Sequence, residues 1–260
     1  MTSTELFYGP DLAAIHADHH EALARTAADV LLPLMPSAGR VLDLGCGAGR
    51  LSLMLAADGH EVVGVDLSPA LLSIAQRRVP SGRFKEGDIL SADFGTVDAI
   101  AAIGEVVNYA TATGGPSALE TLFRRVRESL LLRGRFLFDC AGPNRHGQGE
   151  CVWSEKPDSF VAMQASVRDD IITRKIVTFI RRGSGWEKSS ELHRLRTYEP
   201  AEVCRMLEEA GFEVQRLSGY GEAQLPNGLH PFLATAVNLS GYLRERSDQT
   251  AAEYSKPSSW

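Results

Sequence analysis

The 260-residue sequence predicts an α/β protein in which a mostly parallel, seven-stranded sheet carries helices on both faces. Three observations predict this fold. Apolar runs of strand length alternate with helical segments over residues 40–140, as in repeated β-α units. Glycines recur at alternate positions directly after the first apolar run. From residue 152 to residue 195 the pattern changes to consecutive strands separated by turns, which indicates an antiparallel sheet inserted after the fifth core strand.

The chain is expected to open with a helical lid over residues 1–36. Alanine, leucine and histidine predominate there, and few helix breakers occur before Pro33. Residues 13–32 are predicted to form one amphipathic helix. Since the segment directly precedes a glycine-rich turn, we expect it to lie over the mouth of a ligand pocket.

The first core strand, near Val41, ends in the turn Gly45-Cys46-Gly47-Ala48-Gly49, and a helix is predicted over residues 51–58. Because glycine has no Cβ, a ligand can lie directly against the backbone N–H groups of such a turn. The spacing departs from the dinucleotide fingerprint G-x-G-x-x-G, because Arg50 stands at the third glycine position. Asp43, just before the turn, would repel a pyrophosphate but would suit a ligand with an ammonium and a sulfonium.

The second strand, residues 61–66, ends in another acid. Asp66 lies near the offset at which a carboxylate meets a ribose in nucleoside-binding units, and a carboxylate can accept both ribose hydroxyls. Ser68 is expected to cap a helix that begins at Pro69 and continues to residue 78. The alternative interpretation is that Asp66 is simply a solvated residue at the end of a strand. The sequence argues against this, because Asp43 and Asp66 both lie at strand ends next to the same glycine-rich turn.

A third acid, Asp88, follows the short third strand over residues 83–85, although Gly-Asp after a strand is also a common turn. The fourth strand, residues 97–103, is an unbroken apolar run typical of a buried parallel strand. Gly104 and Glu105 therefore leave its carboxyl end, the edge at which open parallel sheets bind ligands.

The remaining elements follow the same two patterns. A helix over residues 118–132 is predicted to end at Arg133-Gly134, before a fifth strand near Phe136. The inserted strands are expected at residues 152–154, 160–167, 171–180 and 187–195. A helix over 200–210 and strands over 213–218 and 232–237 then complete the core.

Together these features resemble the class I methyltransferases that use S-adenosylmethionine, whose first motif is similar to residues 41–50 here. The stretch Leu195-Arg196-Thr197-Tyr198 also resembles the late part of small-molecule members, so the resemblance covers about residues 37–142 and 196–238. It implies a Rossmann-like core, S-adenosylmethionine as methyl donor and S-adenosylhomocysteine as product. The donor-binding residues that it implies are Asp43, Gly45, Cys46, Gly47, Gly49, Asp66, Leu67, Asp88, Ile89, Gly104 and Glu105.

The resemblance also implies roles for some of these positions. An acid at the place of Asp88 accepts the adenine amino group in this family, and Leu67 and Ile89 would enclose the ring. The backbone at Gly104 and Glu105 would approach the methionine part of the donor. The sequence lacks Asn-Pro-Pro-Tyr and Asp-Pro-Pro-Tyr, which members use on exocyclic base amines and glutamine side chains, and this argues against those substrates.

On this basis we expect five segments. They are a helical lid (1–36), a donor-binding core (37–142), an inserted antiparallel sheet (143–195), the end of the core (196–240) and a mobile tail (241–260). The inserted sheet carries the large apolar side chains Trp153, Phe160, Met163, Phe179 and Trp186. They predict either an acceptor pocket over the donor or a packing surface, on the core or in a homodimer, and the sequence leaves both interpretations open.

Methyl transfer from a sulfonium is an in-line displacement at carbon, so the protein mainly positions the acceptor and excludes water. An amine acceptor must only be neutral, whereas a phenol or an acidic carbon must lose a proton. The first candidates for positioning or proton removal are Tyr8, His16, Tyr109 and His146. Further candidates are His19, His20, His193, Arg196 and Tyr198.

Composition narrows the function classes. A net charge of −6 without a basic stripe argues against a nucleic-acid partner. The four cysteines form no C-x-x-C pair, so neither a metal site nor a disulfide framework is expected. The lack of a signal sequence and of a membrane-spanning run predicts a cytoplasmic protein without a membrane partner.

The main hypothesis is a methyltransferase that acts on N, O or C of a small molecule such as a natural product. An N-methyltransferase of a peptide or protein is the alternative, and a nucleotide-binding module without catalysis is a third hypothesis. Asp43 and the missing third glycine argue against the third.

Overall fold

A computed structural model describes residues 8–17, 21–35, 38–221 and 225–238 of the protein. The predictions for His19, His20 and the tail 241–260 lie outside these residues. The helices of the described residues are α1 (Pro10–His16), α2 (Glu21–Leu31), the 3-10 helix η1 (Leu32–Leu34), α3 (Arg50–Ala57), α4 (Pro69–Arg78), α5 (Val106–Ala110), α6 (Gly115–Ser129) and α7 (Pro200–Glu209).

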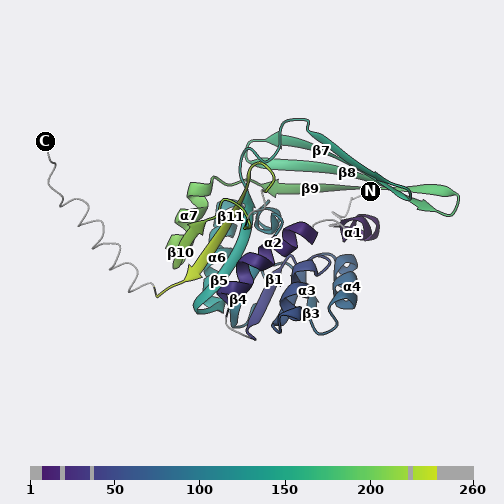
Figure 1. Ribbon diagram of the computed structural model, residues 1–260. Helices are drawn as coiled ribbons and strands as arrows, with labels where there is room; N and C mark the ends of the chain where they lie inside the picture. The colour runs from purple at the N-terminus through teal and green to yellow at the C-terminus, as the bar shows by residue number, and fades with distance from the viewer. Residues whose placement is uncertain (1–7, 18–20, 36–37, 222–224, 239–260) are drawn as a thin grey trace.

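The core is a seven-stranded sheet in the order β10-β11-β5-β4-β1-β2-β3 (Figure 1). Its strands are β1 (Arg40–Leu44), β2 (Glu61–Asp66), β3 (Arg83–Glu86), β4 (Val97–Ala102), β5 (Leu130–Ala141), β10 (Phe212–Arg216) and β11 (Leu229–Ala236). β11 is antiparallel to both of its neighbours, and the other pairs are parallel. The chain order reverses between β1 and β4, so a crevice opens where the carboxyl ends of these two strands diverge.

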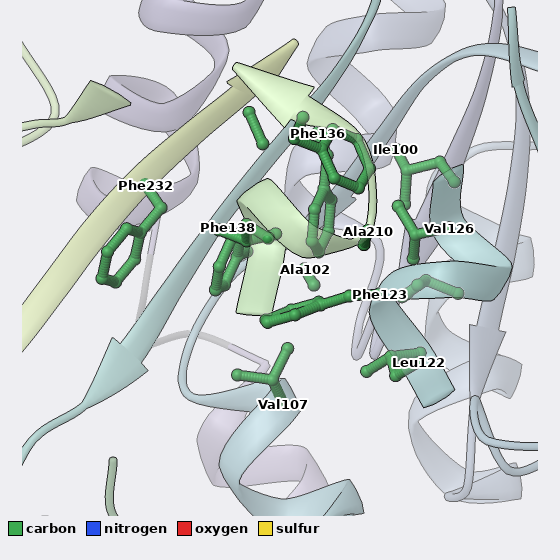
Figure 2. Packing of buried hydrophobic residues seen from close by; sticks show 14 of the residues in the cluster. Ile100, Ala102, Val107, Leu122, Phe123, Val126, Phe136, Phe138, Ala210 and Phe232 are labelled. Atoms are coloured by element: carbon green, nitrogen blue, oxygen red, sulfur yellow. The ribbon is translucent and has the colours of Figure 1, made fainter. Parts of the chain in front are cut away.

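The period-2 alternation of the strands divides the core into two faces. Leu42 and Phe136 pack in one cluster with α6 and α7, whereas Val41 and Leu137 pack in another with α2 and α3. On the first face Phe123, Phe136, Phe138 and Phe232 lie among aliphatic side chains (Figure 2). Phe138 stacks on Phe136 with ring centroids 4.5 Å apart and on Phe232 at 5.1 Å. The stacked rings join β5 to β11 on this face of the core.

A second sheet follows β5 and consists of β6 (Cys151–Lys156), β7 (Ser159–Arg168), β8 (Ile171–Arg182) and β9 (Gly185–Arg196), paired antiparallel in that order. It extends above the core sheet, with α1 near one end of it (Figure 1). Asp11 of α1 pairs with Arg182 of β8 at 2.7 Å, and Gly9 N–H donates to Glu191 of β9 at 2.9 Å. The inserted antiparallel sheet, the helical lid and the parallel core confirm the predicted fold class.

Two predicted helices differ from the structure. The single helix over 13–32 is wrong, because α1 packs with Ala48 and Leu71 near α4 while α2 packs on the other core cluster, and the two docking sites lie on different elements. The helix predicted over 118–132 already ends at Ser129. Leu130 joins β5 by pairing with Val97 of β4, so the apolar run that looked helical begins the strand.

Candidate functional site

A cavity of about 700 Å³ lies at the carboxyl ends of the core strands, between the glycine-rich turn, α1, α5 and the inserted sheet. Ten of the eleven predicted donor-binding residues line it, and so do all four first-ranked candidates, Tyr8, His16, Tyr109 and His146. Gly49 is the exception. It is the N-cap of α3, where an added Cβ would lie 3.0 Å from Ala75, so its glycine serves close packing of the turn on α4.

The glycine-rich turn is fixed from two sides. Gly45, Gly47 and Gly49 all have positive φ angles, which favour glycine. The N–H groups of Gly45 and Cys46 both donate to the Val65 carbonyl, at 2.7 and 3.1 Å. A Cβ on Gly45 would come within 2.4 Å of Val106, whereas a Cβ on Gly47 would meet nothing closer than 4.0 Å. The turn is therefore closed toward the protein at Gly45 and open at Gly47.

Asp43 is buried beside this turn, with 3% of its surface exposed. The Ser52 hydroxyl donates to its carboxylate at 2.6 Å. Burial raises the pKa of Asp43 to about 7, although the Ser52 hydrogen bond acts in the opposite direction. A cationic group in the cavity would stabilise the charged form, so this position is matched to a positive ligand.

Asp66 serves the turn itself. Its two carboxylate oxygens accept the N–H groups of Gly47 and Ser68, each at 2.8 Å. Burial nevertheless raises the pKa of Asp66. Each carboxylate oxygen can accept a further hydrogen bond, so the predicted ribose contact is compatible with this geometry.

The predicted adenine-binding residues lie at the same end. Asp88 is exposed and accepts the Leu90 N–H at 2.9 Å, which is the turn geometry that the sequence left as an alternative. Leu67 is 46% exposed and Ile89 is 5% exposed. Both side chains line the cavity, so they form an apolar boundary on which a ring could lie.

Asp139 lies near the end of β5, before Cys140 and Ala141, and is not among the site residues predicted from the sequence. It is fully buried and accepts the N–H groups of Gly104, at 2.9 Å, and Glu105, at 2.6 Å. These two residues have positive φ angles after β4. Burial raises the pKa of Asp139 to about 6. Asp139 thus fixes the backbone that was expected to face the methionine part of the donor.

The side chain of Glu105 joins two arginines. Arg174 of β8 contacts both of its oxygens, at 2.7 and 2.8 Å, and Arg145 donates from Nε at 2.6 Å. Burial alone would raise the pKa of Glu105, but the two guanidinium groups outweigh this effect and lower it. No sequence motif marks these arginines, because Arg174 lies in an inserted strand and Arg145 in the loop after β5.

Two phenols stand next to this ion pair. Arg174 donates to the Tyr109 hydroxyl at 2.9 Å, and the hydroxyls of Tyr109 and Tyr8 are hydrogen-bonded to each other. The ring of Tyr8 lies 4.5 Å from that of His16 and 5.0 Å from that of His193, centroid to centroid. Burial raises the pKa of both phenols, so each keeps its proton at neutral pH.

His146 is held between two charged groups. Its Nε2 accepts from Arg174, at 2.8 Å from Nη2, and its Nδ1 lies 2.8 Å from Glu150. Since arginine can only donate, Nε2 is unprotonated and the ring is the neutral Nδ1–H tautomer. Burial contributes most to the lowered pKa of His146. Both ring nitrogens are thus engaged within the protein.

Other candidates lie elsewhere. Tyr198 donates to Thr111 at 2.6 Å, Arg196 pairs with Asp170, and neither lines the cavity. Of the apolar side chains of the inserted sheet, Trp153 and Met163 line the cavity, whereas Phe160, Phe179 and Trp186 do not.

Comparison with known proteins shows which proteins share this fold and this sequence pattern. A solved S-adenosylmethionine-dependent methyltransferase from Clostridium acetobutylicum shares the fold, with a TM-score of 0.75 over 87% of this chain and 98% of that chain, at 20% identity. Residues 41–129 match a family described as a methyltransferase domain. Residues 41–129 thus form a methyltransferase domain, and the chain has the fold of S-adenosylmethionine-dependent methyltransferases.

Two further proteins resemble this methyltransferase. A putative methyltransferase of Bacillus subtilis (strain 168) is 28% identical over 194 residues, which are 71% of this chain and 77% of the relative. A solved sugar N-methyltransferase from a Streptoalloteichus species has a TM-score of 0.73 at 19% identity, covering 92% of this chain and 98% of its own. The predicted family, fold class and enzyme class are confirmed.

The residues present in the methyltransferase fit S-adenosylmethionine, the donor of this class. The buried carboxyl group of Asp43, whose charged form a cationic ligand would stabilise, lies beside a turn that has no Cβ at Gly47 and so leaves room for a ligand. Within the described ranges, no helix is long and apolar enough to cross a membrane. The same residues contain no group of three or more His, Cys, Asp or Glu side chains that could hold a metal ion. The five-segment division, the cytoplasmic location and the homodimer stay predictions.

The open side of the turn generates a first test. Gly47→Ala adds a Cβ that touches no protein atom but takes up space on the cavity side, so we expect S-adenosylhomocysteine to bind more than about tenfold more weakly. Gly183→Ala is the matched control, because its φ of 61° resembles the 52° of Gly47 and its surroundings are also open, yet it lies outside the cavity. Both variants should lose about 1–2 kcal/mol of stability. Calorimetric titration would contradict this account if both variants bound like the wild type.

Proposed function

We propose that this methyltransferase transfers the methyl group of S-adenosylmethionine to an amine nitrogen of a polar small molecule. The observation that carries the proposal is the pair of hydrogen-bonded, protonated phenols, Tyr8 and Tyr109, which line the same cavity as Asp43. A neutral phenol cannot remove a proton from an acceptor near pH 7, but its oxygen can accept an N–H group. An amine fits these residues, because it reacts once it is neutral. The likeness in fold to a sugar N-methyltransferase supports the same acceptor class.

The residues of the chain would then act by positioning. When bound, S-adenosylmethionine supplies a methyl group that its sulfonium has already activated. Tyr8, whose hydroxyl donates to Tyr109 and is held through it by Arg174, accepts an N–H bond of the acceptor and so directs the nitrogen lone pair toward the methyl carbon. The N–C bond forms as the C–S bond breaks, and the product ammonium then releases its proton. Tyr8 and α1, tied to Ser68 and Glu191, cover the cavity and exclude water.

Burial of Asp43 predicts a dependence on pH. The pKa of Asp43 is about 7 in the free protein, against an ordinary value of 3.8, so it carries a proton below pH 7. Binding of a cation there requires the carboxylate, so binding must release that proton. We expect the Kd of S-adenosylmethionine to rise as pH falls from 7 to 5.5, by up to about tenfold per pH unit. Calorimetry at pH 6 in two buffers of different ionisation enthalpy should detect proton release, and equal heats of binding in the two buffers would contradict this role of Asp43.

The hydrogen-bonded phenols are tested by turnover. Tyr109→Phe removes the hydroxyl that holds Tyr8, so we expect kcat with an amine acceptor to fall by about 100-fold while the Kd of S-adenosylhomocysteine stays within about threefold. Tyr198→Phe is the matched control, since it removes a buried, hydrogen-bonded hydroxyl outside the cavity. Turnover of Tyr109→Phe within twofold of the wild type would contradict the assignment.

The acceptor for that assay comes from a screen that detects S-adenosylhomocysteine. Amino sugars, other small amines, alcohols, carboxylic acids and peptides with free N-termini form the arms of the screen. Turnover with small amines is the expected result. Turnover confined to peptides would support the alternative hypothesis, and turnover confined to alcohols or acids would overturn N-methylation.

A further inference from the structure

Charged groups of both signs line the cavity. The acids are Asp43, Asp66, Asp88 and Glu105, and the arginines are Arg50, Arg145 and Arg174. Arg50 pairs with Glu21 of α2, whereas Arg145 and Arg174 share the single carboxylate of Glu105. His146 adds no charge there, because its Nε2 accepts from Arg174. The carboxylates of Glu150, on His146, and of Asp139, on the Glu105 N–H, lie close by, so the two arginines differ in their hydrogen bonding rather than in any net charge around them.

Of the two arginines, only Arg145 has donors to spare. Arg174 uses Nε and both terminal nitrogens on Glu105, Tyr109 and His146. Arg145 uses Nε alone, on Glu105, and neither of its terminal nitrogens has a hydrogen-bond partner among the described residues. Its side chain is 17% exposed and lines the cavity. The unused edge of this guanidinium presents the paired N–H donors that carboxylates and phosphates bind.

Arg145 is also held in place before any ligand arrives. Its backbone N–H donates to the Gly142 carbonyl at 3.1 Å, and the Gly142 N–H donates to Gly228 at 2.8 Å. Gly228 has a φ of 69°, and a Cβ there would lie 2.4 Å from the backbone nitrogen of Arg145. The loop after β5 is therefore packed against the residues that lead into β11. Because both the backbone and the Nε of Arg145 are already held, its side chain loses little conformational freedom when it binds a ligand.

From these contacts we propose that Arg145 binds an anionic group of the acceptor, a carboxylate or a phosphate, away from the nitrogen that is methylated. The acceptor is then an amine that also carries an acidic group. This inference rests on the proposed small-molecule function, but it concerns a separate part of the acceptor. The bound anion would take up the guanidinium donors of Arg145 that Glu105 leaves unused.

The test measures anion binding without turnover. Inorganic pyrophosphate and malonate are titrated separately into the protein saturated with S-adenosylhomocysteine, so that the donor site is filled. We expect at least one of them to bind the wild type with a millimolar Kd, and at least about tenfold more weakly to Arg145→Gln. Arg145→Lys keeps a positive charge that can pair with Glu105, so we expect this variant to fold. Its ammonium lacks the second pair of N–H donors that a guanidinium presents, so it should also lose most of the affinity for the anion.

The matched control is Arg205→Gln on α7, which also removes an arginine paired with a carboxylate, Glu209, but outside the cavity. It should bind the anion like the wild type. The affinity of every variant for S-adenosylhomocysteine should stay within about twofold of the wild type.

Two results would overturn the proposal. If both anions bind the wild type no better than Arg145→Gln, Arg145 serves only to neutralise Glu105. If Arg145→Gln weakens S-adenosylhomocysteine tenfold and the anions bind only when the donor site is empty, Arg145 holds the carboxylate of the donor instead. Anion binding and S-adenosylhomocysteine binding are both measured without turnover. They can therefore be interpreted even if the screen finds no amine acceptor, and the two proposals can fail independently.

Discussion

The carboxylate of Asp66 is the constraint on which the site depends. By accepting the N–H groups of Gly47 and Ser68, it ties the glycine-rich turn after β1 to the turn after β2. Three glycines with positive φ angles would otherwise leave this part of the chain with many accessible conformations. The same Ser68 donates its hydroxyl to the Tyr8 carbonyl, so the position of the lid follows from the position of the turn. One acid at a strand end thus orders both the glycine-rich turn and the segment at Tyr8.

A second constraint joins the two sheets. Glu105 leaves the core at the end of β4, and Arg174 reaches it from β8 of the inserted sheet. A buried pair of this kind gives little net stability, because desolvation offsets the attraction, but its two parallel hydrogen bonds fix orientation. Through Arg174 the pair also fixes Tyr109 and His146. The inserted sheet therefore contributes the residue that orders Tyr109 and His146, while Asp43, Asp66 and the glycine-rich turn all belong to the core.

The difference between these two groups of residues explains what the sequence could predict. The group in the core is local: Asp43, the glycines and Asp66 are close along the chain, and their spacing carries the motif. The group around Tyr109 is assembled from residues far apart in sequence, such as Tyr8, Glu105 and Arg174, and no spacing rule brings them together. Tyr109 and His146 were found because they follow strand ends, whereas Arg145 and Arg174 had no such signal. Asp139 gave a weaker signal than Asp66, because Cys140 and Ala141 follow it within β5 whereas Asp66 is the last residue of β2. The single helix over 13–32 was wrong because composition does not show that α1 and α2 pack against different elements.

The most direct test of the account is calorimetric titration of the full chain with S-adenosylmethionine and, separately, with NAD. If the glycine-rich turn and the carboxylates beside it bind a positively charged nucleoside, titration gives a saturable heat of binding with S-adenosylmethionine and none with NAD. At 100-fold excess over its Kd, the bound donor should also stabilise the protein against unfolding by about 2.7 kcal/mol. Heat with NAD alone, or no heat with S-adenosylmethionine, would contradict the central claim that this turn and its carboxylates hold the methyl donor.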